Sequence, residues 1–239
     1  MGDIADTGER ILLEKETPLM IARHFCAYKF AKDYAAGKTV LDIGCGEGYG
    51  SFYLSGFAQE VVGIDYDQGV IEYAKAKYQK NNLRFFTLNA NALDSLKDKF
   101  DIICSFQCIE HIKEAENFLR SIRGLLKDKG IFICSTPNRK DASPGRVTPV
   151  NKFHVKEYLQ DEFKALLEEY FKNLDMFGLK RGRSLNFYRR LKKAGLCNFL
   201  PEAINPVKRF YGRIDCNNFI IVKDHLDSAL DFIGVCRKS

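Results

Sequence analysis

Between residues 39 and 179, short apolar segments that suit β-strands alternate with segments whose apolar residues recur at helical spacing. In chain order, the strand-type segments are TVLDIG, EVVGIDY, LRFFTLNA, FDIICSFQ, GIFICSTP and NLDMFGL. Strands that are apolar along their whole length are covered on both faces, and connections long enough to hold a helix join parallel strands. The chain is therefore predicted to be an α/β protein, with a doubly wound, mostly parallel sheet and helices on both faces.

The pattern changes near the C-terminus. Residues 217–238, NNFIIVKDHLDSALDFIGVCRK, hold two strand-type runs with only a short turn between them. Because this turn is too short for a parallel crossover, the last strand is predicted to be antiparallel, as part of a final hairpin. The whole sheet is expected to have about seven strands.

The length of 239 residues fits one large domain. Helical spacing predicts a helix over residues 19–36 that ends at Gly37, and amphipathic helices over 112–126 and 155–171. We therefore expect a single domain over residues 1–239, with an N-terminal helical cap at 1–38. Residues 180–215 are predicted to form a basic insertion before the final hairpin.

The first strand runs directly into a glycine-rich loop, VLDIGCGEGYG, residues 40–50. Glycine costs roughly 0.5–1 kcal/mol relative to alanine inside an element, so four alternating glycines indicate backbone that a ligand approaches closely. The spacing excludes the G-x-G-x-x-G fingerprint of dinucleotide-binding sites, and no Gly-Lys-Ser/Thr follows to make a Walker loop. In an open parallel sheet, ligands bind at the carboxyl ends of the strands, where this loop is expected to lie.

The order D-x-G-x-G-x-G, from Asp42 to Gly48, resembles the first motif of the class I S-adenosylmethionine (SAM)-dependent methyltransferases. VVGIDYD resembles their second motif, FDIICSFQCIEHI the fourth and LLKDKGIFICSTPN the fifth, so the resemblance runs from Val40 to Asn138. STPN and FHVKEY are most similar to the small-molecule group (methyltransferase type 11) that includes quinone-biosynthesis O-methyltransferases and relatives acting on cell-surface sugars. The resemblance implies a Rossmann-like fold, SAM as the cofactor and S-adenosylhomocysteine as the product.

The resemblance also implies how the cofactor is held. The glycines would lie against the methionine half of SAM, and Asp65 would accept hydrogen bonds from the ribose hydroxyls. Asn89, where the family often has aspartate, would offer an amide oxygen to the adenine, while Tyr66 either stacks on the adenine or covers the sheet edge. Asp42 is expected to bind because an acid inside an apolar strand needs a strong reason to be buried. The expected cofactor-binding residues are Asp42, Gly44, Gly46, Gly48, Asp65, Tyr66, Asn89, Ala90, Phe106 and Gln107.

Methyl transfer from SAM is an in-line displacement, in which alignment and exclusion of water supply much of the acceleration. A hydroxyl acceptor must also lose its proton, and a base helps by roughly 10²–10⁴-fold. Two histidines suit this role: His111 follows the fourth strand, and His154 follows the loop 138–151, which is predicted to be a lid. Their structural alternatives are starting the next helix for His111 and packing the loop for His154. His24 and His225 are assigned no chemistry.

The eight cysteines are expected to be reduced thiols that pack as small hydrophobic side chains. Several lie inside apolar runs, no CxxC pair exists, and a zinc site is therefore not expected. No cluster of metal ligands is visible in the sequence. A metal site is not expected, and the metal-dependent catechol type of methyltransferase is disfavoured.

The net charge of +6 is concentrated between Lys180 and Arg213, where ten basic residues accompany one acid. The same segment contains several aromatic and leucine residues. It is expected to be either a solvated helical cap or a surface for an anionic or membrane-attached acceptor. Nucleic acid is disfavoured as a partner, because the charge is confined to one segment and no nucleic-acid-binding module accompanies it.

The expected function is methyl transfer from SAM to a hydroxyl or amine of a small or lipid-linked acceptor, in the first place a sugar or a polysaccharide precursor. The alternatives are a quinone-type O-methyltransferase, a nucleic-acid or protein methyltransferase that docks through the basic segment, and a SAM-binding subunit without catalysis. The N-terminus lacks a signal-peptide pattern, so a cytoplasmic location is expected, with peripheral membrane contact through residues 180–213. Nothing in the sequence indicates an oligomeric state.

Overall fold

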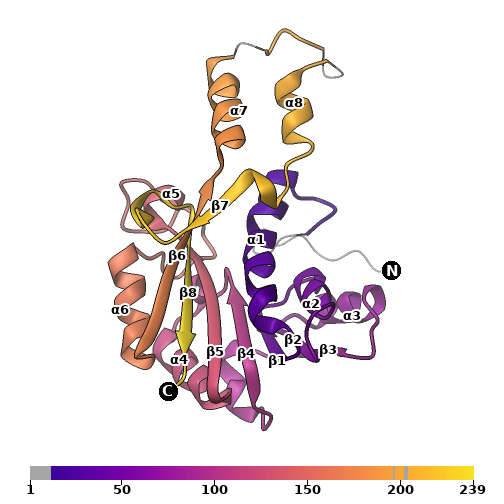
Figure 1. Ribbon diagram of the computed structural model, residues 1–239, viewed down its shortest axis with the longest axis vertical. Coiled ribbons are helices and arrows are strands. Elements are labelled where there is room, and N and C mark those ends of the chain that lie inside the picture. The colour runs from indigo at the N-terminus through magenta and orange to yellow at the C-terminus, as the bar shows by residue number, and fades with distance from the viewer. Residues whose placement is uncertain (1–11, 196, 202–203) are drawn as a thin grey trace.

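The computed structural model describes residues 12–195, 197–201 and 204–239, and among these residues eight strands form one mixed sheet (Figure 1). The strands are β1 (Thr39–Ile43), β2 (Glu60–Asp65), β3 (Leu83–Thr87), β4 (Phe100–Phe106), β5 (Leu126–Pro137), β6 (Asn173–Arg181), β7 (Phe219–Val222) and β8 (Asp231–Arg237). The α-helices are α1 (Pro18–Ala35), α2 (Tyr49–Leu54), α3 (Gln68–Lys77), α4 (Ala115–Leu125), α5 (Arg139–Ala142), α6 (Gln160–Tyr170), α7 (Arg183–Ala194) and α8 (Pro206–Tyr211). Short 3₁₀ helices are η1 (Ala90–Ser95), η2 (Ile109–His111), η3 (Cys216–Asn218) and η4 (Leu226–Ser228).

The strand order is β3-β2-β1-β4-β5-β8-β6-β7, and it places a change of direction at β1. β1 pairs in parallel with β2 on one side and with β4 on the other, so the chain leaves β1 toward one edge and later returns on the opposite side. The loops after β1 and β4 therefore diverge at the carboxyl edge of the sheet. In doubly wound folds, ligands bind where such loops diverge. The mostly parallel sheet with helices on both faces confirms the predicted α/β fold class.

The C-terminal strands differ from the predicted hairpin. β7 and β8 do not pair with each other, because both pair antiparallel with β6, one on each side of it. β8 also pairs antiparallel with β5, which confirms the antiparallel last strand. The described residues thus hold eight strands rather than about seven.

The segment between β7 and β8 crosses β6 at a glycine. A Cβ added at Gly178 would lie 2.8 Å from the Cβ of Ala229 and 3.0 Å from Leu226 Cδ2. The crossing segment can pass this close to β6 only because residue 178 has no side chain. A sequence pattern that shows two short apolar runs cannot distinguish this crossing from a tight turn, which is why the hairpin prediction was wrong.

Each face of the sheet carries its own hydrophobic core. Val40 packs with residues of α1, α2 and α3, whereas the next residue, Leu41, packs on the opposite face with residues of α4 and α6. Both are essentially fully buried, as expected for adjacent residues of a strand covered on both sides. The eight cysteines are free thiols in the structure. Five of them are buried, whereas Cys108, Cys197 and Cys216 are only partly buried.

The first helix begins and ends close to the predicted residues. The Thr17 hydroxyl accepts a hydrogen bond from the backbone N–H of Met20 at 3.3 Å, and Pro18 is the first helical residue. Gly37, just after the helix, has a φ of 68°, a left-handed conformation that favours glycine. Residues 1–11 of the predicted N-terminal cap lie outside the described residues.

Two other helices start later than predicted. The helix predicted over 112–126 begins at Ala115, and the one predicted over 155–171 begins only at Gln160. Residues 155–159 are instead extended, because the N–H groups of Val155 and Lys156 both donate to the backbone carbonyl of Glu110. These contacts hold the segment after His154 along the carboxyl edge of the sheet.

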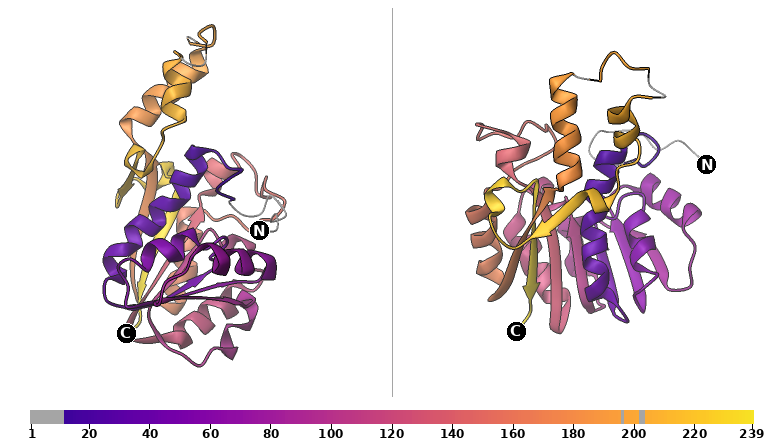
Figure 2. Two further views of the ribbon diagram at one scale, coloured as in Figure 1. Left: turned by 90° about the vertical axis from the view of Figure 1, so that its right-hand side faces the viewer. Right: turned by 45° about the horizontal axis from the view of Figure 1, so that its top comes forward.

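Residues 180–213, which we call the basic arm, carry α7 and α8 as a pair of helices that stand away from the sheet (Figures 1 and 2). The two helices are joined by the rings of Tyr188 and Phe210, which stack with centroids 4.0 Å apart. Leu185, at the base of α7, packs in a small hydrophobic cluster with Ala22 and Cys26 of α1. No helix within the described part of the chain is long and apolar enough to span a membrane.

A buried ion pair joins α1 to the start of β8. The guanidinium of Arg23 contacts both carboxylate oxygens of Asp231, at 2.8 and 2.6 Å, and also donates to the carbonyl of Leu230 at 3.0 Å. The two side chains are only 16% and 5% exposed. A buried pair of this kind is costly to break from one side, because the remaining charge stays buried without a partner.

We expect Arg23→Met to lower the free energy of unfolding by roughly 3–5 kcal/mol, because it leaves the Asp231 carboxylate without its partner. The double variant Arg23→Met/Asp231→Leu should recover much of that loss, since both charges are then gone. Urea denaturation of the wild type, the single variant, the double variant and a control variant measures these changes in the free energy of unfolding. Lys164→Met, which breaks the exposed pair with Glu168, serves as the control and should cost at most ~0.5 kcal/mol. Equal losses in the single and double variants would contradict the role given to the pair.

Candidate active site

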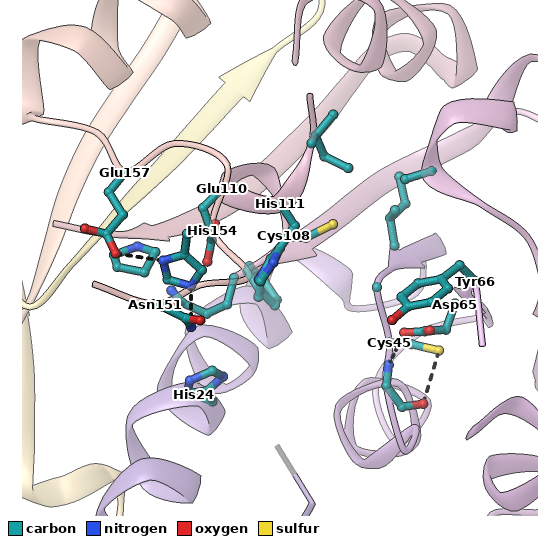
Figure 3. Close-up of a pocket in the computed structure, with 18 of the residues that line it drawn as sticks. His24, Cys45, Asp65, Tyr66, Cys108, Glu110, His111, Asn151, His154 and Glu157 are labelled. Carbon is teal, nitrogen blue, oxygen red and sulfur yellow. Dashed lines mark hydrogen bonds and ion pairs between the residues drawn. The ribbon is translucent and has the colours of Figure 1, made fainter. Parts of the chain in front are cut away.

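A cavity of about 740 Å³ lies at the carboxyl ends of β1, β2 and β4 and extends to the N-terminal half of α1. This volume is in the range of a small-molecule site. Ten of the sequence-predicted site residues line it, namely Gly44, Gly46, Asp65, Tyr66, Asn89, Ala90, Phe106, Gln107, His111 and His154. Figure 3 shows that the labelled side chains form two groups, with Asp65 and Tyr66 in one and the histidines with two glutamates in the other.

The Asp65 carboxylate at the end of β2 is held by backbone N–H groups. One oxygen accepts a hydrogen bond from Gly46 at 3.0 Å, and the other accepts from Asp67 at 3.1 Å. Asp65 is 8% exposed and lines the cavity. Each carboxylate oxygen can accept more than one hydrogen bond, so this fixed group can still accept from ligand hydroxyls.

The glycine loop wraps around the end of β2. The N–H groups of Gly44 and Cys45 both donate to the carbonyl of Ile64, at 2.9 and 3.0 Å. Gly46 has a φ of 53°, and a Cβ placed there would meet no atom of the described residues within 4 Å. The backbone of Gly46 is therefore bare toward open space, as the close approach of a ligand requires.

Two residues predicted to bind the cofactor stand behind the cavity wall instead. Asp42 is completely buried and accepts hydrogen bonds from Ser51 Oγ at 2.6 Å and from the Tyr28 hydroxyl at 3.3 Å. Burial raises the pKa of Asp42 to about 7, although both hydrogen bonds oppose the shift. Gly48 begins α2 with a φ of 84°, and a Cβ there would lie 2.7 Å from the ring of Phe85. Both residues support the loop, and neither lines the cavity.

Beyond β3, Asn89 lines the cavity and caps the 3₁₀ helix η1. Its side-chain oxygen accepts a hydrogen bond from the backbone N–H of Asn91 at 2.9 Å. This contact fixes the side chain at the position where the sequence predicts an adenine contact. Tyr66 is 51% exposed at the cavity rim, which permits stacking on a flat ring.

Gln107, directly after β4, has a left-handed backbone with a φ of 53°. Its N–H donates to the Ser135 carbonyl at 3.0 Å, and its amide nitrogen is 3.4 Å from Asp231 Oδ1. A non-glycine residue in this conformation is costly, and such positions cluster at functional sites. The contact with Asp231 connects this wall of the cavity to the buried ion pair with Arg23.

The second group of side chains surrounds two histidines. The rings of His111 and His154 meet edge to face, with centroids 4.9 Å apart. Glu110 precedes the first histidine on the 3₁₀ helix η2, and Glu157 follows the second by three residues. Glu110 and Glu157 are each about 1–2% exposed, and both line the cavity.

Hydrogen bonds set the tautomers of the two imidazoles. His111 Nδ1 lies 3.0 Å from the carbonyl oxygen of Phe153, and a carbonyl only accepts, so Nδ1 carries the proton. His154 Nδ1 lies 2.7 Å from Glu157 Oε1 and donates to it, while its Nε2 accepts from the Asn151 amide at 3.0 Å. In both neutral rings Nε2 is then the basic nitrogen, and the Nδ1 contact fixes the ring.

Two carboxylate oxygens in this group have no hydrogen-bond partner among the described residues. They are Glu110 Oε1 and Glu157 Oε2, and both are buried. The other Glu110 oxygen accepts from Thr136 Oγ1 at 3.0 Å. Burial, with smaller contributions from Asp231 and Glu157, raises the pKa of Glu110 to about 8. Because unpaired buried polar atoms are rare and costly, this pair of oxygens marks a place where a ligand can complete the hydrogen bonding.

The same group could also hold a metal ion. Glu110, His111 and His154 each offer one donor atom, and these atoms lie within 4.8 Å of one another. Two imidazoles and a carboxylate suit several first-row divalent metals, and the Nδ1 contacts resemble the outer-shell hydrogen bonds that orient metal-bound histidines. The sequence showed no such cluster because its members come from segments far apart in the chain.

Sequence reasoning missed several residues that line this end of the cavity. Arg23 and His24 come from α1, and desolvation by burial lowers the pKa of His24 to about 4. The sequence assigns His24 no chemistry, since nothing local distinguishes this histidine. Glu110 and Glu157 could have been found in the sequence, because Glu110 lies directly before His111 and Glu157 lies three residues after His154.

Comparisons with known proteins agree with this geometry. Residues 35–181 match the family model described as a methyltransferase domain. A probable S-adenosylmethionine-dependent methyltransferase of Mycolicibacterium smegmatis is 36% identical over 75% of this chain and 70% of its own length. A ubiquinone biosynthesis O-methyltransferase of Ruegeria pomeroyi is 34% identical, over 45% of this chain and 44% of its own length.

Among solved structures, a SAM-dependent methyltransferase of Thermotoga maritima, described as a possible histamine N-methyltransferase, is similar in fold. Its TM-score is 0.63 at 12% identity, over 92% of this chain and 93% of that one. At this identity the likeness concerns the fold alone.

The raised pKa of Glu110 predicts how stability depends on pH. The folded protein favours the protonated carboxyl, so this contribution is fully present below about 4.5, the ordinary value, and is lost as pH rises through about 8. Glu110→Gln removes that dependence. Urea denaturation on both sides of this window should show the wild type losing stability relative to the variant as pH rises, and a constant difference would contradict the assignment.

Proposed function

The chain belongs to the methyltransferase domain family, and on that premise we propose that it methylates a hydroxyl of a small polyhydroxylated acceptor such as a sugar. It is a SAM-dependent methyltransferase, and SAM is the methyl donor. The identity of the acceptor and the roles of single residues are our proposal. The observation that carries it is the pair of unpaired carboxylate oxygens beside two oriented imidazoles.

In this proposal, SAM lies along the loop after β1. Its methionine half lies against the backbone of Gly44 and Gly46, and the ribose hydroxyls donate to Asp65. The open space in front of Gly46 and the fixed Asp65 carboxylate support this placement. Asn89 and Tyr66 stand where the adenine would follow, beyond the ends of β2 and β3.

The acceptor then occupies the end of the cavity near α1. Charged and polar residues line this end beside some apolar ones, and they include Arg23, Glu110, Asn151 and Glu157. An acceptor with several hydroxyls can form hydrogen bonds with the two glutamates, because rotation about the terminal carboxyl bond is soft and redirects the unpaired oxygens. Matching several buried polar groups with hydroxyl donors also provides specificity.

The proposed chemistry needs one base. The acceptor hydroxyl attacks the methyl carbon in line with the departing sulfur. Nε2 of His111 removes the hydroxyl proton, or Nε2 of His154 does so once the acceptor replaces the Asn151 amide as its partner. His154 resembles the carboxylate-supported histidine of other enzymes, since Glu157 would stabilise the imidazolium that forms. His111 is held by a backbone carbonyl, which orients the ring without adding charge.

A quinone-type acceptor is the main alternative, and the relative from Ruegeria pomeroyi gives it some support. A flat, apolar ring would require an apolar slot at the acceptor end. The charged lining described above suits a polyol better than an aromatic ring. Methyl-labelled SAM incubated with free saccharides and, separately, with catechols distinguishes the two, and labelling of catechols alone would overturn the polyol proposal.

Asp65→Ala should weaken SAM binding by roughly 1.5–3 kcal/mol, which is about 10- to 150-fold in Kd, because charge-assisted hydrogen bonds to the ribose are lost. Isothermal titration with SAM measures this. Asp94→Ala removes an exposed acid that does not line the cavity and is the matched control. An affinity within twofold of the wild type in Asp65→Ala would show that the placement of the ribose is wrong.

Replacing the base should lower kcat by roughly 10²–10⁴-fold while the Kd for SAM stays the same. We expect this for His111→Ala or His154→Ala, and Glu157→Gln should reproduce part of the loss if His154 is the base. His225→Asn, at an exposed turn, is the control. Measurement of kcat across pH should show the acidic limb disappear in the variant that lacks the base, and unchanged rates in both variants would remove the general-base step.

The same assay separates base catalysis from metal catalysis. Under the proposal, activity is insensitive to a chelator. Loss of activity on chelation, with recovery on adding a divalent cation, would replace the base with a metal that activates the hydroxyl through Glu110, His111 and His154.

A further inference from the structure

The basic arm carries most of its cations on its exposed surface. Eight of its ten basic side chains are exposed, namely Arg183, Arg189, Arg190, Lys192, Lys193, Lys208, Arg209 and Arg213. Within the described part of the chain, Arg189, Arg190, Lys192 and Lys193 form no ion pair. A stable domain does not need four unneutralised like charges on one helix, α7, because their mutual repulsion opposes folding.

The arm is fixed to the body of the protein. Tyr188 of α7 stacks on Phe210 of α8 with an interplanar angle of 11°, and Lys192 lies over the ring of Tyr211 at 4.7 Å. At the base, Leu185 and Ile214 are buried against α1. The cations are therefore held in a defined position relative to the sheet.

The outer part of the arm also exposes large apolar side chains. Phe199 is 81% exposed and Ile204 is 60% exposed, both in the segment that joins α7 to α8. Phe187, on α7, is 57% exposed. Cations on the helices with apolar residues at the outer end are the combination that binds the interfacial layer of a membrane.

The arm leaves the sheet at the same edge as the cavity. β5 is antiparallel to β8, and β8 is antiparallel to β6, so β6 runs in the same direction as β5 and β1. α7 follows β6 directly and therefore starts at the carboxyl edge, where the cavity lies. Figures 1 and 2 show the arm extending outward from this edge in every view.

We propose that the basic arm docks on an anionic lipid bilayer, with Phe199 and Ile204 in the headgroup layer and the cations of α7 and α8 against lipid phosphates. Docking in this way turns the carboxyl edge of the sheet toward the membrane, with the arm between them. The further consequence, that the acceptor hydroxyl belongs to a lipid-borne molecule, rests on the proposed function. The docking itself does not, because it can be measured without methyl transfer.

The observations favour a bilayer over a nucleic acid. A nucleic acid would be bound by the cations alone or by aromatic rings that stack on bases, and the aliphatic side chain of Ile204 offers no stacking surface. Exposed apolar side chains at the outermost point are instead stabilised by insertion below the headgroups. A free polyanion would gain nothing from them.

The first test is sedimentation with vesicles at low ionic strength. The wild type should bind vesicles of phosphatidylglycerol and phosphatidylcholine in equal parts, bind phosphatidylcholine alone far less, and dissociate from the anionic vesicles as salt is added. Reversing Arg189, Arg190, Lys192 and Lys193 to Glu should weaken binding by at least several-hundred-fold, since each basic residue contributes about fivefold.

The matched control has the same change in net charge at the opposite edge of the sheet. Lys75, Lys97, Lys129 and Lys172 are exposed and lie before or at the starts of β3, β4, β5 and β6. Their reversal to Glu should leave vesicle binding within a few-fold of the wild type. Both variants should keep their SAM affinity and their circular dichroism spectrum, which shows that the fold is intact.

The second test uses the absence of tryptophan from the chain. Phe199→Trp places a single fluorophore at the outer end of the arm, and its emission should shift to the blue with anionic vesicles. Phe57→Trp, at an exposed site between α2 and β2, puts the same probe at the opposite edge and should not shift. Phe199→Ser should weaken vesicle binding about tenfold and leave binding to heparin unchanged.

Three outcomes would overturn the proposal. These are no vesicle binding by the wild type at low salt, equal loss in the arm and control reversals, or an unshifted Phe199→Trp emission with vesicles alongside tight binding to RNA or heparin. Failure of methylation with intact vesicle binding would instead count against the proposed acceptor and leave the docking surface in place.

Discussion

The site depends on one topological constraint, the placing of β1 between β2 and β4 with all three strands parallel. Because the chain leaves β1 on one side and comes back on the other, the loops at its carboxyl end cannot close over each other. On one side, backbone N–H groups of the glycine loop donate to Ile64 and Asp65. On the other side, η2 follows the end of β4. The cavity between them is the space that neither connection can fill, and the Arg23–Asp231 ion pair holds α1 across its end.

The two ends of this cavity are built by different means. At the end beside β2, backbone groups shape the cavity, with the Asp65 carboxylate fixed by two N–H groups and a loop that contains glycine. At the end near α1, side chains dominate: His154 contacts the side chains of Glu157 and Asn151, and His111 is held by the Phe153 carbonyl. A backbone site tolerates little variation and suits one invariant cofactor, whereas a site made of side chains can change its ligand by substitution.

The same difference explains what the sequence could predict. The strands, the glycine loop and Asp65 follow from local spacing, because a strand followed by a glycine turn has a direct sequence signature. His111 and His154 were predicted singly, but their partners Glu157 and Phe153 depend on how residues 151–159 lie in space, and the helical spacing there wrongly predicted a helix. His24 and the crossing of β6 at Gly178 depend on contacts between distant segments, which no local pattern contains.

The two ends of the long excursion between β6 and β7 lie side by side. Arg181 pairs with Phe219 across neighbouring antiparallel strands, and the Gly182 N–H donates to the Asn218 carbonyl at 2.8 Å. Topologically, everything between them is the loop of a β-hairpin, and the cost of closing a loop grows only slowly with its length. The match to the family model also stops at residue 181, where this loop begins. Insertion, deletion or exchange of this segment can therefore occur in evolution without rebuilding the sheet that carries the cavity.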